Sequence, residues 1–190
     1  MMETYLVSDT NSAIKLAFVE DKFFEEDFIS KGKVLLFGKV VHEEVCRHIL
    51  NPNKKRIMKQ LTFLKDCDYY YDLNHDEMEF WSYQNSEFKD AKEELSPDSP
   101  LGTSDNDELV LYLALINNYG LVTNEYTLKK LALQVGEVDV WTTEDLFLMA
   151  YDEGKMSKED VQAVIDNWKE KEEYIIGSKK QAFKDKGFRT

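Results

Sequence analysis

The fold of this chain follows from one stretch near its N-terminus, Tyr5-Leu6-Val7-Ser8-Asp9-Thr10-Asn11. The stretch begins with a short apolar run, which is typical of a strand buried on both faces. Apolar residues return at helical spacing over residues 13–18. In open α/β sheets, chemistry takes place outside the carboxyl ends of the strands. Asp9 therefore stands where a functional carboxylate is expected, although an acid at this point is as often a turn or helix-cap residue.

The composition favours one folded domain that stays in the cytoplasm. The chain has 190 residues, of which 43% are apolar and 13% aromatic, enough to build a core. It has no apolar run of about 18 residues that could span a bilayer, and its N-terminus does not resemble a signal peptide. Cys46 and Cys67 form no metal-binding or redox pair, which favours reduced thiols over a disulfide.

The charge is strongly negative overall but unevenly distributed. The net charge of −13 argues against binding nucleic acid by general basic attraction. Residues 179–190, however, carry five basic side chains against one acidic one, and a second basic patch contains Lys54, Lys55, Arg56 and Lys59. Such patches are usually solvated surface, and the alternative is local contact with phosphate groups.

Strands and helices alternate along the sequence. We expect strands at residues 4–8, 34–37, 121–123 and 138–141, and helices at 12–19, 40–50, 54–64, 76–95, 104–116, 126–134, 142–151 and from 157 onward. Residues 20–32 should add helical turns, and Tyr69-Tyr70-Tyr71 remains unassigned. This alternation predicts an α/β fold, a three-layer α/β/α sandwich with a mainly parallel central sheet.

The chain divides into a main domain and an extension. We expect the main domain over residues 1–150, interrupted by a helical insertion at 51–100. Residues 151–190 should form a C-terminal helical extension, because they are too few to bury a core alone. The basic tail after Gly177 is expected to be loose at its end.

Acidic residues recur at one structural position, the carboxyl end of a strand or the start of the following helix. They are Asp9, Glu43, Glu44, Asp105, Asp107, Glu108 and Glu125. In a parallel sheet these positions share one edge, where unpaired carboxylates about 4 Å apart repel by a few kcal/mol. A divalent cation would relieve this repulsion, and hard oxygen ligands select Mg²⁺ or Mn²⁺. Taken singly, each acid is also explained as a helix cap or as a first-turn residue that favours the helix dipole.

Several motifs together resemble the PIN domain family, whose members include toxin ribonucleases of toxin–antitoxin pairs. The first is Val7-Ser8-Asp9-Thr10-Asn11, and the second is Glu44-Val45 in the helix after the second strand. The third is the apolar helix from Asp107 to Ala114, and the fourth is Leu121-Val122-Thr123-Asn124-Glu125. Residues 138–154 also resemble the last strand and helix of one subgroup. The resemblance covers about residues 4–50 and 101–165, and residues 51–100 match no part of the family.

The resemblance implies an Mg²⁺- or Mn²⁺-dependent endoribonuclease that hydrolyses RNA. It makes Asp9 the main metal ligand, Glu44 the second acid and Asp107 the third, with Asp105 as the alternative. Glu125 stands where the family usually has Asp, so its longer side chain could reach the metal through water. Thr10, Asn11, Thr123 and Asn124 would then orient the ligands. An antitoxin protein partner and a homodimer are left open.

Two other functions compete with the ribonuclease. The first is a catalytically weak PIN-like protein that acts by binding RNA or a protein partner, which the negative charge and Glu125 favour. The second is a phosphatase of the haloacid dehalogenase type, which also begins with an apolar strand and an Asp. That motif requires a second Asp two residues after Asp9, where this chain has Asn11.

Overall fold

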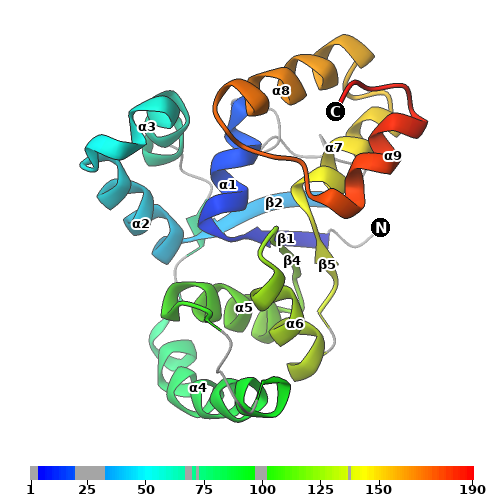
Figure 1. Cartoon of the computed structure of the whole chain (residues 1–190). Helices are drawn as coiled ribbons and strands as arrows, with labels where there is room; N and C mark the ends of the chain where they lie inside the picture. The colour runs from blue at the N-terminus through cyan, green and yellow to red at the C-terminus, as the bar shows by residue number, and fades with distance from the viewer. Residues whose placement is uncertain (1–3, 20–32, 67–69, 72, 97–101, 137) are drawn as a thin grey trace.

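A computed structural model of the chain describes residues 4–19, 33–66, 70–71, 73–96, 102–136 and 138–190 (Figure 1). Its centre is a five-stranded sheet in the order β3-β2-β1-β4-β5, in which every adjacent pair is parallel. The strands are β1 (Thr4–Ser8), β2 (Lys33–Gly38), β3 (Tyr70–Tyr71), β4 (Gly120–Val122) and β5 (Val140–Trp141). The predicted α/β class with a parallel sheet is confirmed.

The opening stretch forms the central strand. β1 pairs with β2 on one side, where Val7 lies opposite Leu36, and with β4 on the other, where Val7 lies opposite Leu121. Leu6 and Val7 have no exposed surface, which agrees with an apolar run buried on both faces. The close approach of β4 to β1 explains Gly120, because a Cβ atom there would lie 2.5 Å from Leu6 Cδ2.

Helices lie on both sides of the sheet (Figure 1). The α-helices are α1 (Thr10–Leu16), α2 (Lys39–Ile49), α3 (Met58–Asp66), α4 (His75–Leu95), α5 (Asp105–Asn117), α6 (Tyr126–Val135), α7 (Thr143–Asp152), α8 (Lys158–Glu170) and α9 (Lys180–Asp185). Short 3₁₀ helices are η2 (Pro52–Ile57) and η3 (Gly177–Lys179). α5 packs against β1, β2 and β4 with α4 and α6 beyond it, and α1 contacts α3 and α7. This arrangement is compatible with the predicted three-layer sandwich.

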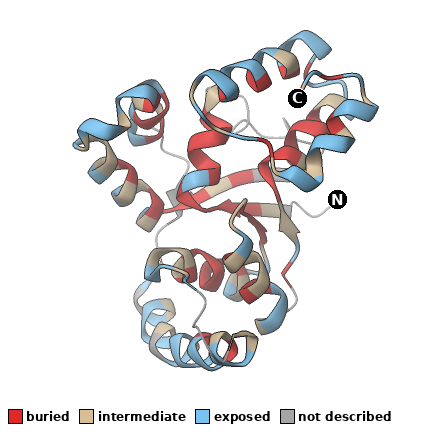
Figure 2. Ribbon diagram, in the orientation of Figure 1, coloured by how far each residue is buried: buried red, intermediate tan, exposed pale blue. Residues whose placement is uncertain are grey.

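The buried residues form one core that extends from the sheet into the helices on both sides (Figure 2). The position of α5 explains why its apolar run is so long, since Val110, Leu111, Leu113 and Ala114 are all buried between the sheet and α4. No helix within the described residues is both long and apolar enough to cross a bilayer.

Three expectations need correction. The insertion is not wholly helical, because Tyr70 and Tyr71 add an edge strand beside Phe37 and Gly38 of β2. The strand expected at 138–141 is only two residues long. The tail is not loose, because Phe183 and Phe188 are buried there and stack edge to face. The helical turns expected at 20–32 lie outside the described residues, as does Cys67, while Cys46 has a free thiol.

Candidate active site at the carboxyl edge of the sheet

Asp9 lies where β1 ends and α1 begins. Its backbone N–H still donates to Val122 O of β4 at 3.2 Å, so the sheet pairing continues one residue past Ser8. Its side chain is the N-cap of α1, and Oδ1 accepts a hydrogen bond of 2.6 Å from the Ser12 backbone N–H. The other oxygen, Oδ2, is buried and accepts no hydrogen bond from any residue that the structure describes. The Asp9 side chain therefore caps α1 through Oδ1, as one interpretation of the sequence expects, and still has a second oxygen that could bind a ligand.

The environment of Asp9 opposes its negative charge. Its pKa is raised to about 6, chiefly by burial and to a smaller extent by the nearby carboxylate of Asp107. The Thr123 hydroxyl and the Ser12 backbone N–H oppose this rise. Buried, perturbed carboxyl groups with a charged neighbour are typical of functional sites, although structural networks produce them as well.

Asp107 and Glu125 reach the same edge from different elements. Asp107 is in the first turn of α5, and its Oδ2 accepts from the Ser104 backbone N–H at 3.2 Å and the Ser104 hydroxyl at 2.6 Å in a capping box. Glu125 is the N-cap residue of α6, just after β4, and its Oε1 accepts from the Thr127 hydroxyl at 2.8 Å. Burial raises the pKa of Glu125, and Asp107 raises it further. Asp107 thus acts electrostatically on both Asp9 and Glu125.

Glu44 is connected to this group through α1 and α5. Its Oε2 accepts hydrogen bonds from the Thr10 hydroxyl at 2.8 Å and from the Asn106 amide at 3.1 Å. Thr10 follows Asp9 in sequence, and Asn106 precedes Asp107. Because α2 begins at Lys39, Glu44 lies in the second turn of the helix and not at its start. The helix-dipole explanation is correspondingly weaker for Glu44.

The site fits a divalent cation in part. Asp9 offers a buried oxygen without a partner, and the neighbouring donors are hard oxygen atoms of the kind that Mg²⁺ and Mn²⁺ prefer. As the side chains stand, however, no three acidic, histidine or cysteine residues among those described are grouped closely enough to hold a metal. The hydrogen bonds give a reason, since Asp107, Glu125 and Glu44 each direct one oxygen toward a neutral donor.

The remaining predicted residues divide between this edge and other places. Thr10 and Thr123 lie at the edge, where Thr123 Oγ1 also accepts from the Glu125 backbone N–H at 3.0 Å. Asn124 turns its amide toward Thr143 Oγ1 at 2.8 Å and Glu144 Oε2 at 3.0 Å. Asn11 and Asp105 are exposed, and only Asp107 of the two candidate third acids affects the pKa of Asp9.

Three further residues at the edge are not among the predicted site residues. The Ser12 N–H binds Asp9, Asn106 bridges α5 to Glu44, and His48 Nε2 lies 3.4 Å from Glu44 Oε1. The spacing of Asp9 and Ser12 is that of an N-cap and its third helical residue, so this contact had a local signal. Asn106 has no such local signal in the sequence, because its hydrogen bond to Glu44 depends on the packing of α5 against α2.

A buried ion pair joins α7 to α1 near this site, and its lysine also contacts the C-terminal extension. Lys15 Nζ donates to Glu144 Oε1 at 2.6 Å and to the Tyr174 carbonyl at 2.7 Å, and it lies 4.4 Å from the centre of the Trp168 ring. Glu144 has no exposed surface, and its oxygens also accept from Thr143, Asn124 and the backbone of Ile176. This carboxylate is fully hydrogen-bonded, unlike Asp9.

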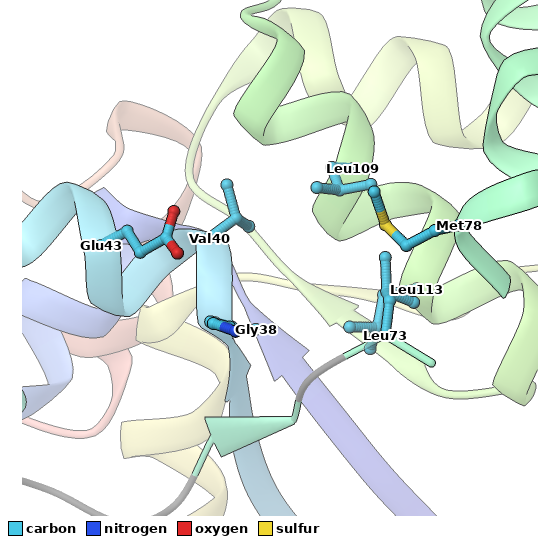
Figure 3. A pocket seen from close by; sticks show the side chains of 8 residues that line it. Gly38, Val40, Glu43, Leu73, Met78, Leu109 and Leu113 are labelled. Carbon is cyan, nitrogen blue, oxygen red and sulfur yellow. The ribbon is translucent and has the colours of Figure 1, made fainter. Parts of the chain in front are cut away.

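An apolar cavity of about 270 Å³ lies beside the acidic edge, between the start of α2 and helices α4 and α5. Figure 3 shows Leu109, Leu113 and Met78 on one side of it, facing Val40 and Glu43 of α2. Leu109 is two residues after Asp107, and Glu43 precedes Glu44. The acidic edge is therefore flanked by a space that suits an apolar group.

Comparison with protein-family models, with curated proteins and with solved structures finds no match for this chain. The basis for assigning a function is therefore the sequence motifs and the geometry of the site.

Proposed function

We propose that the chain is a PIN-like, Mg²⁺- or Mn²⁺-dependent endoribonuclease whose site is the acidic edge around Asp9. The observation that carries the proposal is the buried Oδ2 of Asp9, which has no hydrogen-bond partner among the described residues. Leaving a buried acceptor unsatisfied costs about 1–3 kcal/mol, so a fold that retains one needs a reason. A cation bound by Asp9 supplies that reason.

The residues that would hold the cation are Asp9, Asp107 and Glu125, with Glu44 beside them. Among the described residues, the oxygens that the neutral donors leave over are Asp9 Oδ2, Asp107 Oδ1 and Glu125 Oε2. A bound Mg²⁺ or Mn²⁺ would lower the pKa of a coordinated water and offset charge that develops on a phosphodiester.

The surrounding residues would prepare these carboxylates for that role. The backbone N–H of Ser12 fixes the Asp9 carboxyl group, and the Thr123 hydroxyl lies beside it. Thr10 and Asn106 fix Glu44 from two different helices. Such supporting hydrogen bonds orient metal ligands and tune their basicity.

The test is cleavage of a labelled single-stranded RNA by wild type and Asp9→Asn, with Mn²⁺, with Mg²⁺ and with EDTA. Asn retains an oxygen that can cap α1, so the variant should fold. We expect Asp9→Asn to lose at least about 100-fold in rate, as removal of a metal-binding or charge-stabilising group generally does. The matched control is Asp160→Asn, the same change in the capping box of α8. Cleavage by Asp9→Asn at the wild-type rate would refute the proposal.

A second candidate is a PIN-like protein that binds RNA or a protein partner without cutting. It is favoured by the donors that engage Asp107, Glu125 and Glu44, which leave no three-ligand site ready among the described residues. Calorimetric titration with Mn²⁺ separates the two. Tight Mn²⁺ binding with no cleavage of any RNA would support the binding protein over the ribonuclease.

A further inference from the structure

Three cationic side chains near the acidic edge have no carboxylate partner among the described residues. They are Arg47 at the end of α2 and Lys54 and Lys55 in η2, and we call them the cationic rim. The chain carries 37 acidic against 24 basic residues, so carboxylates are abundant. Other cations use them: Arg56, which follows the rim directly, pairs with Glu172.

The chain path brings the rim together. The Asn51 backbone N–H donates to His48 O at 3.0 Å, and the Lys54 N–H donates to Asn51 O at 3.0 Å, so η2 turns back against the end of α2. α2 and η2 are also in contact with each other. Lys54 and Lys55 therefore lie beside the end of the helix that carries Arg47.

Short contacts link His48, the sequence neighbour of Arg47, to the residue after Asp9. His48 lies 3.4 Å from Glu44, which accepts from Thr10, the residue after Asp9. Arg47 is three residues after Glu44, one turn further along α2 and about 4.5 Å along its axis. The rim thus continues outward from the acidic edge along α2, which extends away from the end of the sheet in Figure 1.

We propose that Arg47, Lys54 and Lys55 bind the phosphates of a single-stranded RNA on the α2 side of Asp9. This inference rests on the proposed ribonuclease function. A polyanion approaching a group of carboxylates in a chain of charge −13 is repelled, and a local cluster of cations is needed to hold it there. Grooves that bind single-stranded nucleic acids carry such cations along the path of the phosphate backbone, and they bind with little preference for sequence. The rim would therefore contribute affinity and direction, and little base specificity.

The test measures RNA binding without cleavage, in the Asp9→Asn background, by fluorescence anisotropy of a labelled RNA of about 12 nucleotides at several salt concentrations. Three phosphate contacts on a single strand contribute about 2 to the slope of log affinity against log salt concentration, which is about 100-fold in affinity at about 0.1 M salt. We expect Arg47→Gln/Lys54→Gln/Lys55→Gln to bind RNA about 100-fold more weakly, with a salt slope smaller by about 2. The charge-retaining Arg47→Lys/Lys54→Arg/Lys55→Arg should keep the slope.

The matched control removes three charges elsewhere. Lys155, Lys180 and Lys184 are exposed and near the C-terminal end of the chain. Lys155→Gln/Lys180→Gln/Lys184→Gln changes the net charge equally and should bind within about twofold of the parent, with an unchanged slope. Equal losses of RNA affinity in the rim and control variants would refute phosphate binding by the rim, because net charge alone would then explain the binding.

Kinetics in the Asp9-containing protein separate the rim from the proposed function. The rim variant should raise KM for RNA cleavage and leave kcat within a few-fold of wild type. The reason is that the rim binds phosphates of the RNA other than the one that is cleaved. A wild type that cleaves RNA, combined with a rim variant of unchanged KM and salt slope, would refute the rim and leave the ribonuclease intact. A wild type that cleaves no RNA would refute the ribonuclease.

Discussion

The buried carboxyl group of Asp9 should make the stability of the fold depend on pH. Its pKa is about 6 in the folded chain, against about 3.9 in an unfolded one. Below about pH 4 both states carry the proton. Between about pH 4 and 6 the unfolded chain releases it first, so the free energy of unfolding falls as pH rises. The loss is complete only when the folded state is also fully ionised, more than about one pH unit above its pKa of about 6.

The size of this loss follows from the difference in pKa. About two pH units at about 1.36 kcal/mol each amount to about 3 kcal/mol. Roughly half of it, about 1.4 kcal/mol, falls between about pH 5 and pH 7.5. That range is the practical one, because lower pH protonates many of the chain's 37 acidic residues.

The assay is urea unfolding of wild type and Asp9→Asn at steps of pH from about 5 to 7.5, followed by circular dichroism. Asn cannot ionise but can still accept the hydrogen bond from Ser12, so the difference between the two curves isolates the carboxyl group. We expect wild type to lose about 1.4 kcal/mol relative to the variant over this range. Parallel curves for the two proteins would refute the reasoning, because Asp9 would then be ionised or exposed in the folded state.

Three other measurements test the site and its supports. Mn²⁺ at about 100 times its Kd should stabilise wild type by about 2.7 kcal/mol in urea at about pH 7.5, and Asp9→Asn by much less; equal gains would remove Asp9 from the metal site. Lys15→Met should lower the free energy of unfolding by about 3–5 kcal/mol, because it leaves Glu144 buried without its counter-charge. Lys171→Met removes a partner from a more exposed ion pair and should lower it by at most about 1 kcal/mol. Phe183→Ala should lower the free energy of urea unfolding by about 3–5 kcal/mol, because the ring is buried. An unchanged unfolding midpoint would instead support a loosely attached tail.

The sequence predicts the parallel α/β frame because its signals are local. β1 and β2 contain continuous apolar runs, and α5 begins at Asp105 after the N-cap Ser104, whose capping box uses Asp107 three residues later. β3 could not be predicted, because three consecutive tyrosines have no periodicity and the strand exists only through its pairing with Phe37 and Gly38. The tail departs from its prediction for a similar reason. Its charge suggests solvent, while Phe183 and Phe188 hold it in the core.

The positions of the candidate acids follow from topology, and their partners do not. Strand ends and helix starts share an edge in any parallel sheet, so Asp9, Asp107 and Glu125 can be grouped from the order of strands and helices along the sequence. The donors that satisfy them depend on side-chain packing. The clearest case is Lys15 and Glu144, which are 129 residues apart in sequence and form a buried pair that no local pattern marks.

The contrast between Glu144 and Asp9 gives the strongest reason to look for a cation at the second. Both carboxylates are buried in the same fold, within reach of α1. Glu144 receives an ammonium group and three further donors, which together offset its desolvation. Asp9 receives only neutral donors, the Ser12 backbone N–H at Oδ1 and the hydroxyl groups beside it, has an acidic neighbour in Asp107, and keeps Oδ2 without a close partner among the described residues. A chain that can satisfy one buried carboxylate fully, and leaves the other short of positive charge, has kept a place where added positive charge would stabilise the fold.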